Sequence, residues 1–431
     1  MNAAKPDARA AAIEILGRVL RENMRLDHAL ETSRELTALE PRDRAFARLL
    51  AATVLRRLGQ IDALLAGFLE RPIPPRAGAV QDALRIGAAQ LLFLQTPPHA
   101  AVATSVELAS RAGHPGMKGL VNAVLRRVTR EGGDILAQQD AARLNTPDWL
   151  WQSWTAAYGE DNARAVALAH LAEAPLDFSV KADAEAWAQK LDAKKLPTGS
   201  LRRAPGGAIE ELPGFAEGAW WVQDAAAALP AKLLGPVAGE IVADLCAAPG
   251  GKTAQLAAAG ARIIAIDRAP ERLRRVADNL ARLHLSAECV AADAETWRPP
   301  EKLRFILLDA PCTATGAIRR NPDVPRGKRA EDVARLAVTQ ARMLRAAIDM
   351  LAPGGTLIYC VCSLQQEEGP FQIKQLLAQG APVVRRPIDA AEIGGLSQCI
   401  TQEGDLRTLP CHLADEGGLD GFFACRLVRR P

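Results

Sequence analysis

Apolar residues recur every three to four positions along the first 130 residues of the chain. Ile13, Leu16 and Leu20 fall on one face of a helix, and the stretches 81–94 and 116–128 keep the same period. Proline-rich segments separate these stretches, since proline cannot continue a helix. The pattern therefore predicts an all-α bundle at the start of the chain.

The helical period fades after residue 130, where polar residues and glycine become frequent, and we place a domain edge near residues 135–145. The pattern is mixed from there to about residue 235. Residues 175–183 alternate between apolar and polar as a strand does, and residues 220–234 run into a helix. These changes predict a small α+β connecting subdomain.

Strand and helix patterns alternate after residue 240, which predicts a doubly wound, mostly parallel, Rossmann-like sheet. We expect three domains, at residues 1–140, 141–235 and 236–431. The strands expected in the last domain are 241–245, 261–267, 287–293, 304–311 and 355–362, and the expected helices are 252–259, 270–284 and 331–351.

Reactive side chains stand where these strands are predicted to end. The residues are Asp244, Asp267, Asp293, Asp309 and Cys362. Ligands of doubly wound sheets bind beyond the carboxyl ends of the strands. A single aspartate in this position often only caps the next helix, but four in succession favour a shared binding crevice.

The segment "DLCAAPGGKT", Asp244 to Thr253, is similar to a phosphate-binding Walker A loop, G-x-x-x-x-G-K-S/T. With "FILLDAP" as a Walker B strand, an ATPase is a serious alternative. Cys246 stands where the first glycine belongs, and we expect it to resist a left-handed backbone, while Pro249 lacks an N–H group. The loop is therefore poorly suited to a triphosphate. No G-x-G-x-x-G motif supports a dinucleotide.

An adenosine group without phosphates suits the aspartates better. Asp267 lies about 20 residues after the glycine loop, where a carboxylate accepts hydrogen bonds from ribose hydroxyls. Asp293 is placed to accept from an adenine amine. The Gly250–Gly251 turn allows close approach of the backbone, and the carboxylates suit a cationic sulfonium. These features indicate S-adenosylmethionine as the cofactor.

Two cysteines follow predicted strands, Cys312 in "DAPCTATG" and Cys362 in "YCVCS". A thiolate that adds to C6 of cytosine makes C5 nucleophilic enough to attack a methyl group. A helix N-terminus, or Arg319 and Arg320, are candidates for activating the thiol. Asp309 is a candidate to hydrogen-bond or protonate the pyrimidine edge.

The remaining cysteines are interpreted as small buried hydrophobes. They are Cys289, Cys360, Cys399, Cys411 and Cys425. The chain has eight cysteines but no C-x-x-C pair, and its six histidines form no H-x-x-x-H pair, so we expect no zinc and no other metal.

Composition and charge narrow the class of protein. The 431 residues are 49% hydrophobic and 24% charged, which is typical of a soluble globular protein. No signal-peptide core and no membrane-spanning run is evident, so we expect a cytoplasmic protein without a membrane partner. The first 130 residues carry 19 Lys and Arg against 12 Asp and Glu. This excess suits a polyanion, although a solvated helical surface explains it equally well.

Four motifs together, "DLCAAPGGKT", "DAPCTATG", "YCVCS" and "DGFFACRL", resemble those of the Sun (Fmu) family of RNA (cytosine-5)-methyltransferases. "AVATSVELASRAGHPGMKGLVNAVLRRV" resembles the end of a NusB-like RNA-binding domain, and "GFAEGAWWVQD" is similar to the segment that precedes the catalytic sheet in this family. The resemblance covers the whole chain. This domain combination is similar to the branch of the family that acts on bacterial 16S ribosomal RNA.

The resemblance implies the roles of individual residues. Cys362 is implied as the nucleophile, and Cys312 is implied to assist release of the methylated RNA. The implied cofactor residues are Cys246, Ala247, Ala248, Pro249, Gly250, Gly251, Lys252, Asp267, Asp293 and Asp309. From the spacing alone, either thiol remained a candidate nucleophile. Lys252 is expected to begin a helix beside the cofactor rather than to hold a phosphate.

The chain departs from the family pattern near these residues. Val361 replaces the usual Thr before the nucleophile, and Cys360 adds a third thiol nearby. The segment "RRNPDVPRGKR" keeps the basic start of the family's substrate loop, but the residues that follow are richer in Pro and Gly than usual. Pro370 is expected to begin a new helix.

We therefore expect a monomeric enzyme that methylates C5 of a cytosine in single-stranded or loop RNA, with 16S ribosomal RNA as its substrate. The residues expected to contact RNA are Lys118, Arg126, Arg127, Arg130, Arg319 and Arg320. The alternatives are methylation of transfer RNA or another RNA, the ATPase above, and a non-catalytic RNA-binding factor.

Overall fold

The computed structural model describes residues 7–431 and divides the chain into two units. The first unit contains the chain up to Ala172 together with residues 318–329, and the second contains residues 173–317 and 330–431. The start of the N-terminal stretch in which we expect no signal peptide lies outside the described residues. No helix between residues 7 and 431 is long and apolar enough to cross a membrane.

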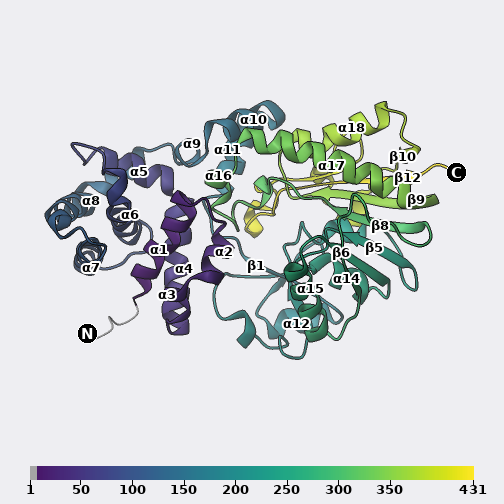
Figure 1. Ribbon diagram of the computed structural model, residues 1–431, viewed down its shortest axis with the longest axis horizontal. Coiled ribbons are helices and arrows are strands. Elements are labelled where there is room, and N and C mark those ends of the chain that lie inside the picture. The colour runs from purple at the N-terminus through teal and green to yellow at the C-terminus, as the bar shows by residue number, and fades with distance from the viewer. Residues whose placement is uncertain (1–6) are drawn as a thin grey trace. The chain divides into compact units, whose positions relative to one another are not determined.

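Helices form the first unit, which confirms the all-α prediction (Figure 1). Its helices are α1 (Ala8–Arg21), α2 (Leu26–Thr32), α3 (Arg34–Thr37), α4 (Pro41–Arg56), α5 (Leu58–Ala66), α6 (Gly78–Leu92), α7 (Pro98–Arg111), α8 (Lys118–Gln138), α9 (Ala141–Asn145), α10 (Asp148–Tyr158), α11 (Glu160–Ala169) and α16 (Val324–Gly327).

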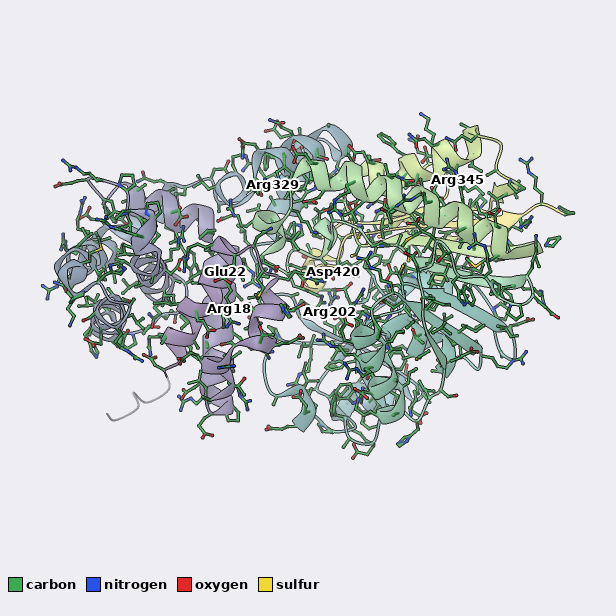
Figure 2. All side chains as sticks on the ribbon, in the orientation of Figure 1. Arg18, Glu22, Arg202, Arg329, Arg345 and Asp420 are labelled. Carbon is green, nitrogen blue, oxygen red and sulfur yellow. The ribbon has the colours of Figure 1, made fainter. Side chains whose placement is uncertain are left out.

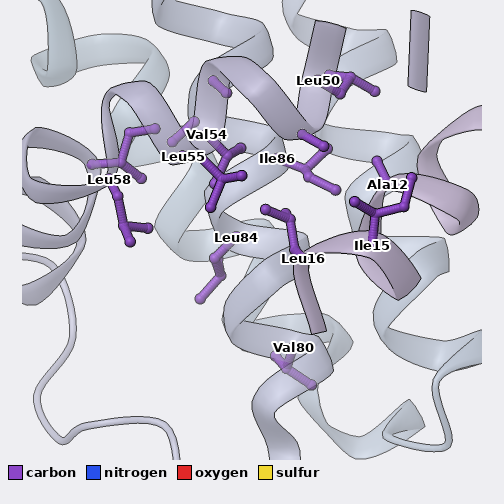
Figure 3. Packing of buried hydrophobic residues seen from close by; sticks show 14 of the residues in the cluster. Ala12, Ile15, Leu16, Leu50, Val54, Leu55, Leu58, Val80, Leu84 and Ile86 are labelled. Carbon is purple, nitrogen blue, oxygen red and sulfur yellow. The ribbon is translucent and has the colours of Figure 1, made fainter. Parts of the chain in front are cut away.

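The apolar stripes of α1, α4, α5 and α6 meet in one core (Figure 3). Leu16 of α1, Val54 of α4 and Leu84 of α6 are all fully buried there. Burial of each such side chain stabilises the fold by about 1.5–3 kcal/mol. The hydrophobic period of the sequence is thus the direct cause of this bundle.

The first unit extends past the domain edge expected near residue 140, because α9 packs closely on α5. A Cβ atom at Gly59 would lie 1.8 Å from the carbonyl oxygen of Leu144. Asn145 Oδ1 accepts a hydrogen bond of 3.2 Å from the Gln60 backbone N–H. Only a glycine at position 59 allows α9 to lie this close to α5. The first unit then continues through α10 and α11.

Residues 318–329, which interrupt the second unit in sequence, complete the first. The backbone N–H of Leu26, at the start of α2, donates a 3.1 Å hydrogen bond to Asp323 Oδ2. Arg56 Nη2 donates to the carbonyl of Arg319 at 3.2 Å. The segment expected to be a substrate loop is therefore held by side chains and backbone of the N-terminal helices.

A small antiparallel sheet opens the second unit, with strand order β2-β3-β1-β4. Its strands are β1 (Leu176–Val180), β2 (Lys194–Lys195), β3 (Leu201–Arg203) and β4 (Trp220–Val222), and α12 (Ala184–Lys190) lies between β1 and β2 in sequence. A buried pair between Asp177 and Arg202 joins β1 to β3 at 2.6 Å. Arg202 also donates to the carbonyl of Gly418 at 2.6 Å, near Asp420 (Figure 2).

The main sheet has the order β10-β12-β9-β8-β5-β6-β7, with β11 paired to β12. Its strands are β5 (Ile241–Leu245), β6 (Arg262–Asp267), β7 (Glu288–Ala291), β8 (Leu303–Asp309), β9 (Leu351–Val361), β10 (Val383–Arg385), β11 (Leu406–Thr408) and β12 (Phe422–Arg429). β5 to β9 pair in parallel, while β10, β11 and β12 are antiparallel. The predicted doubly wound, mostly parallel sheet is confirmed.

Helices cover both faces of this sheet (Figure 1). They are α13 (Leu229–Lys232), α14 (Gly251–Ala258), α15 (Pro270–Arg282), α17 (Ala330–Met350) and α18 (Pro370–Ala378). Alternate residues of one strand enter different cores: Leu307 of β8 packs in the core that contains Leu256 of α14, and Leu308 packs in the core that contains Leu344 of α17. α18 begins at Pro370, as expected.

His170 is buried in the first unit, and its burial predicts that the stability of the fold depends on pH. Its ring lies 5.5 Å from that of Trp154, and neither ring nitrogen has a hydrogen-bond partner among the described residues. Burial, with the positive charges of Arg319 and Arg56, lowers the pKa of His170 to about 3. The imidazole is therefore neutral in the folded protein at neutral pH.

Below about pH 6.5 only the unfolded chain takes up a proton at this position, so the free energy of unfolding should fall as the pH drops from 6.5 toward 3. His170 should lower the free energy of unfolding by about 2 kcal/mol at pH 5 relative to pH 7.5. Urea unfolding at both pH values should show a His170→Asn variant losing that much less on acidification. The same change at exposed His99 should leave the pH dependence intact, and identical behaviour of the two variants would contradict the assignment.

Candidate active site

The parallel pairing of β8 with β9 brings the two reactive segments together. Asp309 is in register with Cys360, and the Ala310 backbone N–H donates to the Cys360 carbonyl at 2.9 Å. Cys312 lies three residues beyond the end of β8, and Cys362 lies one residue beyond the end of β9. Segments 50 residues apart in the sequence thus leave the sheet side by side.

The thiols of Cys312 and Cys362 are in direct contact, with their sulfur atoms 3.4 Å apart. Both side chains are half-buried. The hydrogen bond with Cys362 and the burial of the thiol raise the pKa of Cys312 well above its ordinary value. Cys312 therefore keeps its proton and can donate an S–H hydrogen bond to its neighbour.

Close backbone packing fixes the loop that carries Cys312. The Gly316 N–H donates to the carbonyl of Cys362 at 3.0 Å, and the Gly421 N–H donates to the carbonyl of Gly316 at 2.8 Å. A Cβ atom at Gly316 would lie 1.9 Å from the Gly421 carbonyl oxygen. The glycine of the "DGFFACRL" motif is thus part of the support of the thiol pair.

Asp309 pairs with the lysine of the glycine loop. Lys252 Nζ lies 2.7 Å from Asp309 Oδ2 and 5.0 Å from the centre of the Phe422 ring. The Cys360 thiol lies 3.6 Å from Asp309 Oδ1. Lys252 occupies the first turn of α14, as expected, but its ammonium group contacts the candidate catalytic carboxylate.

The loop before α14 adopts a tight turn between β5 and the helix. Cys246 does take up a left-handed backbone, with φ of +65°, so the expectation that it resists this conformation is wrong. Gly250 has φ of +102°, and a Cβ atom there would lie 3.0 Å from Val276 of α15. Burial raises the pKa of the Cys246 thiol, which makes it a poor nucleophile.

The carboxylates at the strand ends differ in their surroundings. Asp267 is buried, pairs with Arg272 at 3.2 Å and accepts from the Ala248 and Ala269 backbone N–H groups. Asp244 accepts from the Thr253 hydroxyl at 2.6 Å, and burial raises the pKa of this carboxyl to about 7. Asp244 Oδ1 is buried without a hydrogen-bond partner among residues 7–431.

These groups suit S-adenosylmethionine. The unpartnered Asp244 oxygen offers an acceptor at the cofactor loop, and Asp267 and Asp309 add negative charge for a cationic sulfonium. Asp293 lies two residues beyond β7, is exposed, and accepts from the Glu295 N–H at 2.8 Å. Its contact with adenine stays a prediction.

Burial separates several of the other predicted residues. Arg319 is only 2% exposed, so in this structure its guanidinium is not presented to RNA. Cys289 was expected to be buried and is exposed, whereas Cys360, Cys399 and Cys425 are buried and Cys411 is half-buried. Within the described residues, no group of three or more His, Cys, Asp or Glu side chains gathers as a metal site would require.

Comparison with known proteins identifies the family. The model of "16S rRNA methyltransferase RsmB/F" matches residues 231–428, and the NusB family model matches residues 6–130. Ribosomal RNA small subunit methyltransferase B of Pseudomonas putida is 36% identical over 440 aligned positions, and the alignment covers 98% of this chain and 98% of that protein. The chain belongs to the RsmB/F family. Its counterpart in Vibrio cholerae is 36% identical and covers 86% of this chain and 89% of the relative.

Solved structures support the fold of this family member. The crystal structure of PH0851 has a TM-score of 0.77 and 22% identity, covering 99% of each chain. A methyltransferase homologue from Pyrococcus horikoshii has a TM-score of 0.56 and 26% identity, covering 67% of this chain and 97% of its own. The chain is therefore a ribosomal RNA (cytosine-5) methyltransferase that uses S-adenosylmethionine, and the ATPase and the non-catalytic factor are set aside.

Sequence reasoning missed two supports of this family's thiol pair. One is the Gly316–Gly421 backbone contact, for which the glycine in each motif was the available signal. The other is Glu368, a fully buried carboxylate two residues before Pro370. Its neighbours Gln365, Gln366 and Glu367 are polar as well, so the local sequence carries no signal that could have revealed it.

Replacing Gly316 by Ala should disrupt this support, because the new methyl group cannot fit against the Gly421 carbonyl. The expected loss in the free energy of unfolding is about 1–3 kcal/mol, with a lower rate of methyl transfer. Chemical denaturation and a methylation assay measure the two effects. Gly133→Ala, where a Cβ atom would meet nothing within 4 Å on α8, is the matched control and should be neutral or slightly stabilising. Equal stability of the two variants would contradict the contact.

Proposed function

We propose that the protein methylates C5 of a cytosine in 16S ribosomal RNA through a covalent bond between Cys362 Sγ and C6 of that base. The observation that carries this proposal is the contact between the Cys312 and Cys362 sulfur atoms, at the strand ends that also present Asp309. The NusB-like unit and the names of the relatives support ribosomal RNA of the small subunit as the substrate.

The cofactor is held at the loop from Cys246 to Lys252, with Asp267 and Asp293 as further contacts. When bound, S-adenosylmethionine supplies an electrophilic methyl group. The Lys252 ammonium neutralises part of the charge on Asp309 and orients its carboxylate. This pairing leaves Asp309 able to hydrogen-bond the pyrimidine edge.

The chemistry of the chain's own residues begins with Cys362. Its thiolate adds to C6, and the electron pair of the C5–C6 double bond becomes available at C5, which takes up the methyl group. A base then removes the hydrogen from C5, the double bond re-forms, and the bond from C6 to Cys362 Sγ breaks. Cys312 S–H, in hydrogen-bond contact with Cys362 Sγ, stabilises the departing thiolate.

The roles of the two thiols predict different defects. In an assay with labelled S-adenosylmethionine and unmodified 16S RNA, Cys362→Ala should lose methylation by a factor of about 10³ or more, since the nucleophile is gone. Cys312→Ala should form a stable RNA–protein adduct, visible as a band of lower mobility on a denaturing gel.

Cys289→Ala, which changes an exposed cysteine, is the control and should methylate normally without an adduct. If Cys362→Ala stays active while Cys312→Ala loses methylation and forms no adduct, the two roles are reversed.

The basic face of α8 is the proposed contact for RNA phosphates. Arg126 and Arg130 line a groove of about 440 Å³ between α7 and α8, together with His99 and Asn122. Arg126 is exposed and has no ion pair within residues 7–431. Lys118 pairs with Glu107 at 3.3 Å, and Arg127 and Arg130 pair with Glu131 at 3.3 and 3.4 Å, so these three are partly neutralised. Arg126 is thus the strongest candidate, and Arg130 lines the same groove.

Replacing Arg126 and Arg130 together by Ala should weaken RNA binding without a change in the methyl-transfer rate at saturating RNA. Filter binding over a range of salt concentrations should show the slope of log affinity against log salt reduced by roughly 1.4, as for two lost phosphate contacts to single-stranded RNA. Arg345→Ala, an exposed arginine on α17, is the control (Figure 2). An unchanged slope in the double variant would exclude this groove as the contact.

A further inference from the structure

Glu368 is a fully buried carboxylate on the turn between β9 and α18. Its oxygens accept four hydrogen bonds. The donors are the Thr313 N–H at 2.9 Å, the Thr313 hydroxyl at 2.5 Å, the Ser363 hydroxyl at 2.5 Å and Gln340 Nε2 at 3.1 Å. Every lone-pair direction of the carboxylate is thereby engaged.

Two of these partners adjoin the thiols. Thr313 directly follows Cys312, and Ser363 directly follows Cys362. The bond to the Thr313 N–H fixes the backbone at the Cys312 loop, and the bond to Ser363 fixes the residue after β9. One carboxylate therefore bridges the two segments that bring the sulfur atoms to 3.4 Å.

The bridge is itself held by rigid elements. Gln340 of α17 donates to Glu368 and also to the carbonyl of Pro311 at 2.9 Å, one residue before Cys312. The Tyr359 hydroxyl of β9 donates to the Glu368 carbonyl at 2.6 Å. Groups whose own positions are locked in this way can hold a neighbouring site to a fraction of an ångström.

A purely structural role accounts poorly for this choice of residue. Burying a carboxylate costs several kcal/mol unless hydrogen bonds compensate, and apolar side chains fill such a space at lower cost. The compensation here comes chiefly from the residues that follow the two thiols. We propose that Glu368 is a positioning residue for methyl transfer, which fixes Thr313 and Ser363 and so sets the separation of the Cys312 and Cys362 sulfur atoms.

The charge of Glu368 adds to this effect. Its negative field contributes to the raised pKa of the Cys312 thiol, after the hydrogen bond with Cys362 and burial. Glu368 therefore helps to keep a proton on Cys312, which leaves the Cys362 sulfur as the nucleophile that attacks C6. This inference rests on the proposed function, in which the two thiols have different tasks.

The full-length Glu368→Ala variant tests the proposal by two measurements. The first is the equilibrium with glutathione, in which two protein thiols and oxidised glutathione give the Cys312–Cys362 disulfide and two reduced glutathione molecules. The equilibrium constant reports the effective concentration of one thiol at the other. We expect this constant to be about tenfold lower in Glu368→Ala than in the wild-type protein. The second is methyl transfer, where kcat should fall by about 10 to 100-fold while KM for S-adenosylmethionine stays within twofold.

Glu368→Gln should rescue both readings to within about threefold, because an amide still engages all four partners and hydroxyl groups can accept as well as donate. Gln372→Ala is the matched control. This buried side chain donates to the carbonyls of Ala337 and Glu367 but has no bond to Thr313 or Ser363. It should lower stability while leaving both readings unchanged.

The proposal is wrong if folded Glu368→Ala matches the unchanged protein within twofold in both readings, or if Gln372→Ala loses as much as Glu368→Ala. Should Glu368→Ala fail to fold, Thr313→Val, which removes one hydroxyl donor, is judged by the same two criteria. If the unchanged protein methylates no cytosine, the proposed function fails, and the glutathione equilibrium alone decides whether Glu368 sets the spacing of the thiols.

Discussion

The parallel pairing of β8 with β9 is the constraint on which the active site depends. It places Asp309 beside Cys360 and sends two loops off the same edge of the sheet. These loops carry Cys312 and Cys362, whose sulfur atoms are in contact. The remaining contacts, from Gly316, Gly421 and Glu368, refine a proximity that the strand order already provides.

Charged side chains gather at the carboxyl ends of the parallel strands. Carboxylates from β5, β6 and β8 converge with a single lysine on α14, and each carboxylate has a different set of donors. Lys252 stabilises Asp309, backbone N–H groups and Arg272 stabilise Asp267, and a hydroxyl stabilises Asp244. A bound cation would relieve the mutual repulsion that remains.

The sequence predicted the elements well because hydrophobic period and proline placement are local properties. Strands β5, β6 and β8 end within two residues of their expected positions, and α17 begins one residue before the expected start. The strand-end aspartates and the thiols were found for the same reason. Long-range partners were not predictable: nothing local pairs Lys252 with Asp309, places Glu368 against Thr313, or buries Arg319 in the helical unit. Such contacts depend on which segments the fold brings together.

The dependence of the helical unit on residues 318–329 has a consequence for how the protein is made. The ribosome delivers the N-terminal helices first, yet the acceptor for the Leu26 N–H belongs to Asp323, and a partner of Arg56 is the Arg319 carbonyl. Those helices remain incomplete until β5 to β8 of the catalytic sheet have also been synthesised. An N-terminal fragment that ends at residue 172 therefore lacks a part of the unit to which it belongs.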